Sequence, residues 1–313
     1  MTEQTGILIT GLSKKFDNIQ ALDQVTTRIQ KGSIFGLIGS NGAGKSTFLR
    51  LLAGIYRPDA GQILIDGQPV YENENLKQRI FYISDDQFYL NSCTLNDMCR
   101  LYSNFYPTWS KERFEKLVKS FGLDPDRKVN TFSKGMRRQG EVILALSVMP
   151  KFMFCDETFD GLDPIMRDYA AGILMADVAE YGTTVILSSH NLRELEQLCD
   201  HIALIHDGKL LINRSVDDMK DNTFKCQVVF DKPDISVERM DPFDMKKTGK
   251  LTSFVAVGTN EELEGKIKNI AAENGAEIVY FEALPLTLEE IFTHEINSRG
   301  LNKLIYGGAD HEK

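Results

Sequence analysis

The sequence predicts an α/β fold in which a mainly parallel sheet is followed by a smaller α/β domain. Over the first two thirds of the chain, short apolar strands alternate with longer helical patterns, which is typical of a parallel sheet flanked by helices. The composition shifts after about Asn213, and the 313 residues suit one large and one small domain. We therefore expect a first domain over residues 1–215, a second over 216–297 and a mobile tail over 298–313.

In the first domain, the apolar segment Ile34–Ile38 predicts a strand, and a Gly-rich turn and a helix over about residues 45–53 follow it. Gln62–Ile65 and the Asp66-Gly67 turn predict an antiparallel hairpin. From about residue 90 to 145, helical patterns such as Lys111–Phe121 replace the strands, so we expect an inserted helical subdomain. Further strands are predicted at Phe152–Cys155, Thr184–Ser188 and Ile202–His206.

The second domain has its own apolar patterns. Strands are predicted at Thr223–Phe230, Ser253–Val257 and Glu277–Phe281. A helix is predicted to end near Gly275, because four apolar residues before it share one face: Leu263, Ile267, Ile270 and Ala271. The segment Thr287–Glu290 has the pattern of a capping box and predicts the start of a last helix.

The composition argues against several classes of protein. Hydrophobic residues make up 42% of the chain and charged residues 26%, as in soluble globular proteins. The net charge of −9 argues against broad nucleic-acid binding. No run of 18 apolar residues occurs, and the N-terminus does not resemble a signal peptide. The five cysteines form no CxxC pair, so we expect reduced thiols in a cytoplasmic protein and no zinc site.

A phosphate-binding loop is predicted at residues 39–46, which match GxxxxGK[ST] at every fixed position. The strand before this segment and the helix after it disfavour an ordinary Gly-rich turn. We expect Lys45 to reach the β- and γ-phosphates of ATP and Ser46 to bind Mg²⁺, while backbone N–H groups surround the phosphates. The predicted ATP-binding residues of this segment are Gly39, Ser40, Asn41, Gly42, Ala43, Gly44, Lys45, Ser46 and Thr47.

Two carboxylates, Asp156 and Glu157, follow the apolar segment Phe152–Cys155. A buried strand would deliver them to the carboxyl edge of the sheet, where open α/β sheets bind ligands. We expect Asp156 to hold Mg²⁺ through water and Glu157 to act as general base toward the attacking water. Acidic residues are common at strand ends, so this motif gains its weight from its place after the phosphate-binding loop.

With a third motif between these two, residues 5–215 resemble the nucleotide-binding subunits of ABC transporters. The segment Phe132–Gln139 lies where that family has its LSGGQ signature; it keeps Ser133 and Gly135 and differs at Phe132, Lys134 and Met136. The resemblance implies that the Ser133 hydroxyl and the Gly135 N–H contact the γ-phosphate bound to the opposite subunit. Taken alone, the segment would better fit a plain helix N-cap with a basic first turn.

Three further positions match the family. Gly161-Leu162-Asp163 resembles its D-loop, which signals between the two sites. His190 resembles the switch histidine that contacts the γ-phosphate, so it joins Lys45 and Glu157 as an expected catalytic residue. Phe16 lies where an aromatic ring stacks on adenine in the family, and a core phenylalanine is the alternative.

The chain departs from the family where a glutamine normally binds Mg²⁺ and senses the membrane partner. The alignment of Ile80–Gln87 puts Asp85 in the place of that glutamine and leaves Gln87 as the alternative. The resemblance therefore implies Asp85 as a Mg²⁺ ligand, beside Ser46 and Asp156. The D-loop also begins Phe159-Asp160, where Ser or Asn is usual before the glycine, so the sequence determines ATP binding better than the hydrolysis rate.

The resemblance implies a RecA-like P-loop NTPase core with an antiparallel β subdomain and an inserted helical subdomain. It implies an ATPase that uses ATP and Mg²⁺ and that pairs head to tail around two ATP molecules, with a copy of itself or a paralogous subunit. The partner would be a separate transmembrane permease, and the chain would lie on the inner face of the cell membrane without binding nucleic acid. Leu286–Phe292 resembles the exporter-associated branch, which favours a lipid, peptide or antibiotic-like substrate.

Two other classes fit less well. ATPases of the same superfamily that act on ribosomes carry two nucleotide domains in one chain, and those that act on DNA carry long coiled coils; neither feature is in the sequence. A small-molecule kinase would use the phosphate-binding loop but would not need the segment Phe132–Gln139. ATP-driven dimerisation would exclude the kinase.

Overall fold

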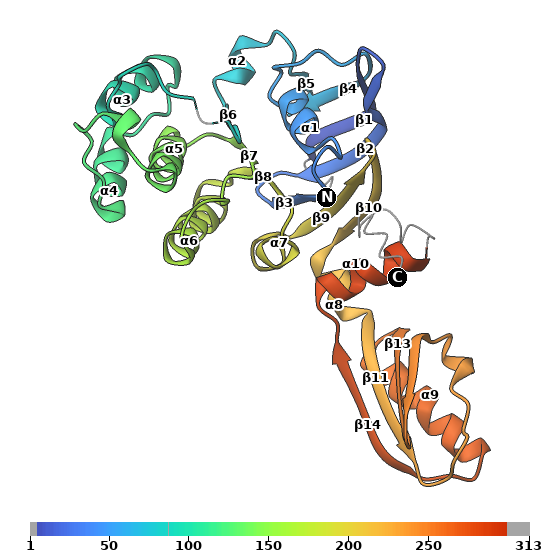
Figure 1. Cartoon of the computed structure of the whole chain (residues 1–313). Helices are drawn as coiled ribbons and strands as arrows, with labels where there is room; N and C mark the ends of the chain where they lie inside the picture. The colour runs from blue at the N-terminus through green and yellow to red at the C-terminus, as the bar shows by residue number, and fades with distance from the viewer. Residues whose placement is uncertain (1–4, 87, 299–313) are drawn as a thin grey trace, which may run out of the picture. The chain divides into compact units, whose positions relative to one another are not determined.

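The computed structural model describes residues 5–86 and 88–298, and the chain divides into two compact units, Met1–Asn213 and Arg214–Lys313 (Figure 1). The predicted mobile tail, apart from Ser298, lies outside the described residues, as does Gln87. No helix among the described residues combines the length and the apolar character that crossing a membrane requires.

A six-stranded sheet forms the centre of the first unit. Its strands are β3 (Ile34–Ile38), β6 (Ile80–Ile83), β7 (Phe152–Asp156), β8 (Thr184–Ser189), β9 (His201–His206) and β10 (Lys209–Ser215), in the order β10-β9-β3-β8-β7-β6. Neighbouring strands are parallel throughout the part of the sheet formed by β9, β3, β8, β7 and β6. This confirms the predicted parallel sheet, and every residue of β3, β7 and β8 is buried, as expected when helices cover both faces.

A four-stranded antiparallel sheet accompanies the parallel one. It contains β1 (Thr5–Phe16), β2 (Ile19–Gln30), β4 (Ala60–Ile65) and β5 (Gln68–Pro69), in the order β2-β1-β4-β5. The predicted hairpin is confirmed, since β4 and β5 are joined by Asp66 and Gly67. Both turn residues have positive φ, 47° and 76°, as two-residue hairpin turns of this kind require.

Helices cover both faces of the parallel sheet. Helix α1 (Lys45–Leu52) packs between the two sheets, where its Phe48 and Leu52 share one core with Phe154 of β7. Helices α5 (Lys134–Val148) and α6 (Pro164–Tyr181) pack on the other face, where Met153 and Cys155 of β7 point. Helix α7 (Leu192–Leu198) packs on β3 and β8.

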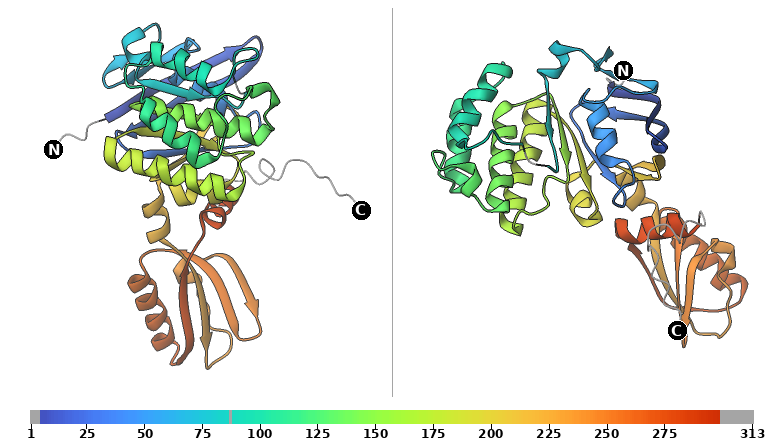
Figure 2. Two further views of the ribbon diagram at one scale, coloured as in Figure 1. Left: turned by 90° about the vertical axis from the view of Figure 1, so that its left-hand side faces the viewer. Right: turned by 45° about the horizontal axis from the view of Figure 1, so that its top comes forward.

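The predicted helical subdomain lies between β6 and β7. It contains α3 (Leu95–Phe105), α4 (Lys111–Phe121), the 3₁₀ turn η1 (Val129–Thr131) and α5. The green helices of this subdomain lie together in Figure 2. The bounds of α4 match the predicted helix, and its apolar face is buried: Phe114, Leu117, Val118 and Phe121. A further short helix, α2 (Glu74–Lys77), precedes β6.

The second unit is an antiparallel sheet with one face covered by a helix. Its strands are β11 (Thr223–Phe230), β12 (Phe243–Thr248), β13 (Leu251–Val257) and β14 (Ile278–Pro285), in the order β12-β13-β11-β14. Its helices are α8 (Val216–Asp221), η2 (Glu238–Met240), α9 (Asn260–Glu273) and α10 (Leu288–Ser298). The predicted helix face of α9 is confirmed as part of this core, whereas β12 was not predicted.

Candidate nucleotide-binding site

The phosphate-binding loop joins β3 to α1 at the carboxyl edge of the parallel sheet. Gly39 and Gly44 are required there by close packing. A Cβ atom on Gly39 would lie 2.4 Å from the carbonyl oxygen of Ile205, and one on Gly44 would lie 2.6 Å from that of Ala21. Gly44 also has φ +111°, which favours glycine. The loop is therefore held against β9 and against the start of β2.

Lys45 joins this loop to the acidic motif. Its side chain is buried, and its Nζ donates to the carbonyl oxygens of Gly39 and Ser40 at 2.7 and 3.2 Å. The same Nζ lies 3.2 Å from Oε1 of Glu157. The phosphate-binding loop and the acidic motif, more than 100 residues apart in the sequence, thus meet at one ammonium group.

Asp156 is fully buried at the end of β7, and both of its carboxylate oxygens accept hydrogen bonds. Ser188 Oγ donates to Oδ1 at 2.8 Å, and the Tyr82 hydroxyl donates to Oδ2 at 3.0 Å. Burial, together with the nearby charge of Asp156, raises the pKa of Tyr82 to about 12, so this hydroxyl keeps its proton at neutral pH. The carboxylate of Asp156 is therefore fixed in orientation.

Glu157 begins a turn with a left-handed backbone, φ 47°, which is uncommon for a residue with a side chain. Its N–H points at Ser188, with 3.0 Å to Oγ and 3.2 Å to the carbonyl oxygen. Such strain of roughly 1–3 kcal/mol is retained at functional sites when the surroundings fix the conformation. Here it directs the carboxylate of Glu157 toward Lys45 and His190.

His190 follows β8 and faces two carboxylates. Its Nδ1 lies 3.4 Å from Oδ2 of Asp160 and 3.8 Å from Oε2 of Glu157. Burial raises the pKa of Asp160, and the nearby imidazole of His190 opposes that shift. The predicted catalytic residues Lys45, Glu157 and His190 thus form one continuous cluster.

Two of the predicted Mg²⁺ ligands, Ser46 and Asp156, have side chains whose chemistry suits a magnesium ion. Ser46 lies in the first turn of α1, directly after Lys45, and Asp156 supplies a fixed carboxylate. Both offer hard oxygen atoms, which Mg²⁺ prefers.

Asp85 has a different set of contacts. Its Oδ1 and its carbonyl oxygen accept hydrogen bonds from Arg138 of α5, at 3.2 and 3.0 Å. The alternative residue, Gln87, lies outside the described residues. The role of Asp85 as a Mg²⁺ ligand stays a prediction.

Phe16 is the last residue of β1 and pairs with Ile19 of β2. Its ring is 38% exposed, which leaves a face for a ligand. The ring centroid lies 5.2 Å from that of Tyr56, and Lys14 Nζ lies 5.3 Å from the Phe16 centroid. The stacking of Phe16 on adenine stays a prediction. A core phenylalanine, the alternative, fits this exposure less well.

Ser133 and Gly135 lie apart from the cluster around Lys45. Ser133 is the N-cap of α5 and accepts a hydrogen bond from Met136 N–H at 3.2 Å. A Cβ atom on Gly135 would lie 3.2 Å from the carbonyl oxygen of Gly161 in the D-loop. Among residues 5–86 and 88–298, no hydrogen bond or ion pair joins Ser133 or Gly135 to residues 39–47.

Three residues of the site were not predicted: Tyr82, Asp160 and Ser188. The pairing of β6 with β7 would have indicated Tyr82. Tyr82 pairs with Phe154, and Asp156 lies two residues after Phe154 in β7, so all three side chains point to the same face of the sheet. Ser188 was part of the predicted strand before His190, but its contacts to both Asp156 and Glu157 depend on how β7 and β8 pair.

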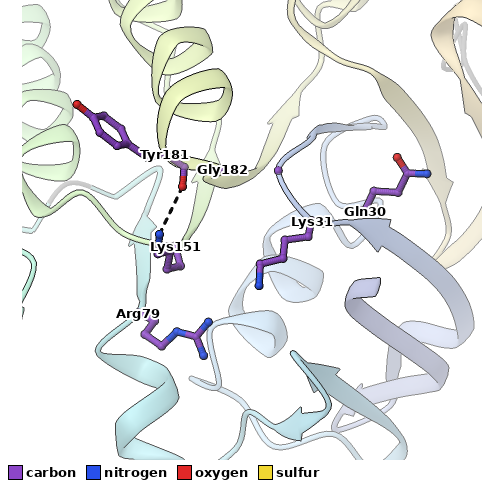
Figure 3. Close-up of a pocket in the computed structure, with 7 residues that line it drawn as sticks. Gln30, Lys31, Arg79, Lys151, Tyr181 and Gly182 are labelled. Atoms are coloured by element: carbon purple, nitrogen blue, oxygen red, sulfur yellow. Dashed lines mark hydrogen bonds between the residues drawn. The ribbon is translucent and has the colours of Figure 1, made fainter. Parts of the chain in front are cut away.

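A separate pocket of about 520 Å³ lies at the opposite edge of the parallel sheet, where strands begin (Figure 3). Its cations are Lys31, Arg79 and Lys151, which come shortly before β3, β6 and β7. Lys31 and Arg79 both pair with Asp66, and Lys151 donates to the carbonyl oxygen of Tyr181 at 3.4 Å. None of the predicted nucleotide-binding residues lines this pocket.

Comparison with known proteins identifies relatives of this chain. The family model for ABC transporters matches residues 22–160. The bacitracin transport ATP-binding protein BcrA of Bacillus licheniformis is 28% identical over 315 aligned positions, which cover 97% of this chain and 99% of BcrA. The uncharacterized ABC transporter ATP-binding protein YdbJ of Bacillus subtilis is 32% identical. The alignment covers 70% of this chain and 72% of YdbJ. A solved structure of an ATP-binding subunit of an ABC transporter is also similar, with a TM-score of 0.64 and 28% identity over 69% of this chain and 92% of that one.

Proposed function

The chain belongs to the ATP-binding proteins of ABC transporters, and from that premise we propose that it hydrolyses ATP to drive a separate membrane-spanning subunit. The observation that carries the proposal is the convergence of Lys45, Glu157 and His190 at the end of the phosphate-binding loop. A binding protein without catalysis would need the loop alone. A carboxylate placed within reach of the same lysine suits hydrolysis.

In this proposal each side chain has a distinct role. The ammonium group of Lys45 exchanges its contacts with the loop carbonyls for the β- and γ-phosphate oxygens. Glu157 accepts a proton from the attacking water as general base, and His190 donates a hydrogen bond to the γ-phosphate. Ser46 and Asp156 would hold Mg²⁺, whose charge offsets that of the phosphate oxygens when it is bound.

We infer that catalysis needs two copies of the nucleotide-binding unit. Ser133 and Gly135 begin α5, which covers one face of the parallel sheet, whereas Lys45 begins α1 on the other. A single chain therefore keeps its signature residues and its phosphate-binding loop on different helices, and among the described residues no hydrogen bond or ion pair joins them. In a head-to-tail pair, Ser133 and Gly135 of one copy close the site of the other. The second copy is a further molecule of this chain or a paralogous subunit.

The membrane-spanning partner would dock beside the loop that follows β6. Two large apolar side chains of that loop are exposed, Phe88 (62%) and Leu90 (44%). Exposed apolar residues that lie together in one region mark interaction sites. By this docking the chain would lie on the inner face of the membrane. Since BcrA is named for bacitracin transport, the proposed cargo is an antibiotic-like, peptide or lipid molecule, moved outward.

The substitution Lys45→Ala tests catalysis. ATPase activity should fall by roughly 10²-fold or more, since a buried charge that meets the transferred phosphate is removed. The matched control is Lys31→Ala, which removes a lysine at the opposite edge of the same sheet and should leave turnover within about twofold. Undiminished turnover in Lys45→Ala would show that this loop is not the catalytic site.

A further inference from the structure

Arg138 is a buried arginine in the second turn of α5, with an exposed fraction of 1%. Its guanidinium contacts the loop after β6 through three hydrogen bonds. Nη1 donates to the carbonyl oxygen of Ser84 at 2.8 Å, and Nη2 donates to the carbonyl oxygen and Oδ1 of Asp85 at 3.0 and 3.2 Å. Nη1 also pairs with Oε2 of Glu141 at 3.0 Å. A buried guanidinium is stabilised only when such partners surround it.

A second contact ties the same loop to the same helix. The Tyr89 hydroxyl donates to the carbonyl oxygen of Arg137 at 2.5 Å. Gly140 allows this close approach, because a Cβ atom there would lie 2.9 Å from the Tyr89 hydroxyl oxygen. The loop therefore holds the start of α5 at two points, the carbonyl oxygen of Arg137 and the guanidinium of Arg138.

The two ends of this connection belong to different parts of the proposed catalytic unit. The loop continues β6, whose Tyr82 donates a hydrogen bond to Asp156. The helix begins at Ser133 and Gly135, the residues that close the other copy's site in the proposed pair. A shift of the loop relative to β6 would thus move the start of α5 with it.

We propose that Arg138 and Asp85 form a latch, meaning the set of hydrogen bonds between the Arg138 guanidinium and residues 84–85, and that this latch sets the orientation of the signature residues. Both are positioning residues, and the carboxylate of Asp85 serves α5 through Arg138. The consequence for transport rests on the proposed function, because it assumes that Ser133 and Gly135 act on a second copy. The latch itself is a property of the single chain.

Amide hydrogen exchange of the full chain without nucleotide tests the latch directly. Asp85→Lys places a positive charge against Arg138, and Arg138→Met removes the guanidinium while keeping an apolar side chain of similar length. Asp85 is 61% exposed, so its replacement leaves the core packing intact. Both variants should raise exchange in the first two turns of α5 by about tenfold, since the helix loses charge-assisted hydrogen bonds.

Two matched controls accompany these variants. Asp86→Lys adds the same charge to the neighbouring exposed residue, and Arg100→Met removes an exposed arginine of α3. Neither should change exchange in α5 by more than about twofold. If Asp85→Lys and Arg138→Met leave α5 as protected as the controls do, the latch does not exist. Because the exchange is measured without nucleotide, this result does not depend on whether the chain hydrolyses ATP.

The ATPase kinetics of Asp85→Asn and Asp85→Glu separate the latch from a metal site. As a latch residue, Asp85→Asn should lower turnover by about threefold to tenfold without changing the KM for ATP or the half-saturating Mg²⁺ concentration. Asp85→Glu, which keeps the carboxylate, should restore most of the turnover. A shifted Mg²⁺ dependence in Asp85→Asn, with α5 still protected, would overturn the latch and assign Asp85 to the metal. Inactive wild-type protein would contradict the proposed function and leave the exchange result standing.

Discussion

At the scale of single residues, Ser188 and Tyr82 organise the acidic end of β7. They bind the two oxygens of Asp156, and Ser188 also accepts from the N–H of Glu157. The sequence predicted the two carboxylates, because their residue types and their position after an apolar strand indicate a phosphate site. It did not predict the residues that orient them. Those depend on which strands are neighbours in the sheet, and this is a property of the tertiary fold.

Glu141 gives a pH dependence that belongs to this scale. Burial raises its pKa from the ordinary value near 4.5 to about 7, although the charge of Arg138 opposes the shift. An acid with a raised pKa contributes stability that is present below pH 4.5 and is lost as the pH rises through about 7. Relative to Glu141→Gln, the free energy of unfolding of the wild type should therefore fall by roughly 2 kcal/mol between pH 5 and pH 8.

Urea unfolding of both proteins at the two pH values measures this difference. Glu115→Gln, on the exposed side of α4, is the control and should show no such divergence. Equal pH dependence of the wild type and Glu141→Gln would mean that Glu141 is ionised throughout this range.

At the scale of elements, the fold was most predictable where both faces of a strand are buried. The segments of β3, β7, β8 and β9 were predicted to within one residue at each end, because a short apolar run bounded by polar residues leaves little choice. In contrast, β12 was missed. It is a sheet-edge strand with the sequence Phe-Asp-Met-Lys-Lys-Thr, and its five residues after Phe243 are exposed. Its pairing with β13, which no local pattern encodes, forms this strand.

The turn between β3 and α1 offers a prediction at the same scale. Gly39→Ala should lower the free energy of unfolding by about 1–3 kcal/mol, because the added Cβ would meet the carbonyl oxygen of Ile205 at 2.4 Å and the loop would have to shift. Gly172→Ala in α6 is the matched control. No atom lies within 4 Å of its added Cβ, so this change should be neutral or slightly stabilising. Urea unfolding with an ATP-binding assay checks both, and an equally stable Gly39→Ala with intact binding would contradict the packing argument.

At the scale of the whole molecule, the described nucleotide-site residues all lie in the first unit, Met1–Asn213. The second unit has a separate core formed by β11, β13 and α9. The sequence predicted a domain boundary after residue 215 from a change in composition and a new set of strand patterns. Within this unit, Leu286–Phe292 is the segment that resembles a known family, and that resemblance indicates a branch of transporters rather than an activity of the unit itself.

Removal of the second unit should therefore leave nucleotide binding in place. A chain that ends at Ser215, the last residue of β10, should bind a fluorescent ATP analogue with a Kd within about threefold of the full chain. Circular dichroism would confirm that the shortened chain is folded. Loss of binding in a folded chain of this length would contradict the proposed domain boundary.

The proposed pairing of two copies around ATP is the central claim, and the mass of the Glu157→Gln protein in solution tests it most directly. Glutamine keeps the shape of Glu157 but does not accept a proton from water, so ATP should bind through Lys45 and remain unhydrolysed. Light scattering after gel filtration should show a dimer with ATP and Mg²⁺ and a monomer with ADP, and adding Ser133→Arg should abolish the dimer. The measurement is repeated with the chain co-purified with its membrane subunit. If the chain still binds ATP there but is present as a single copy with both nucleotides, the pairing is contradicted.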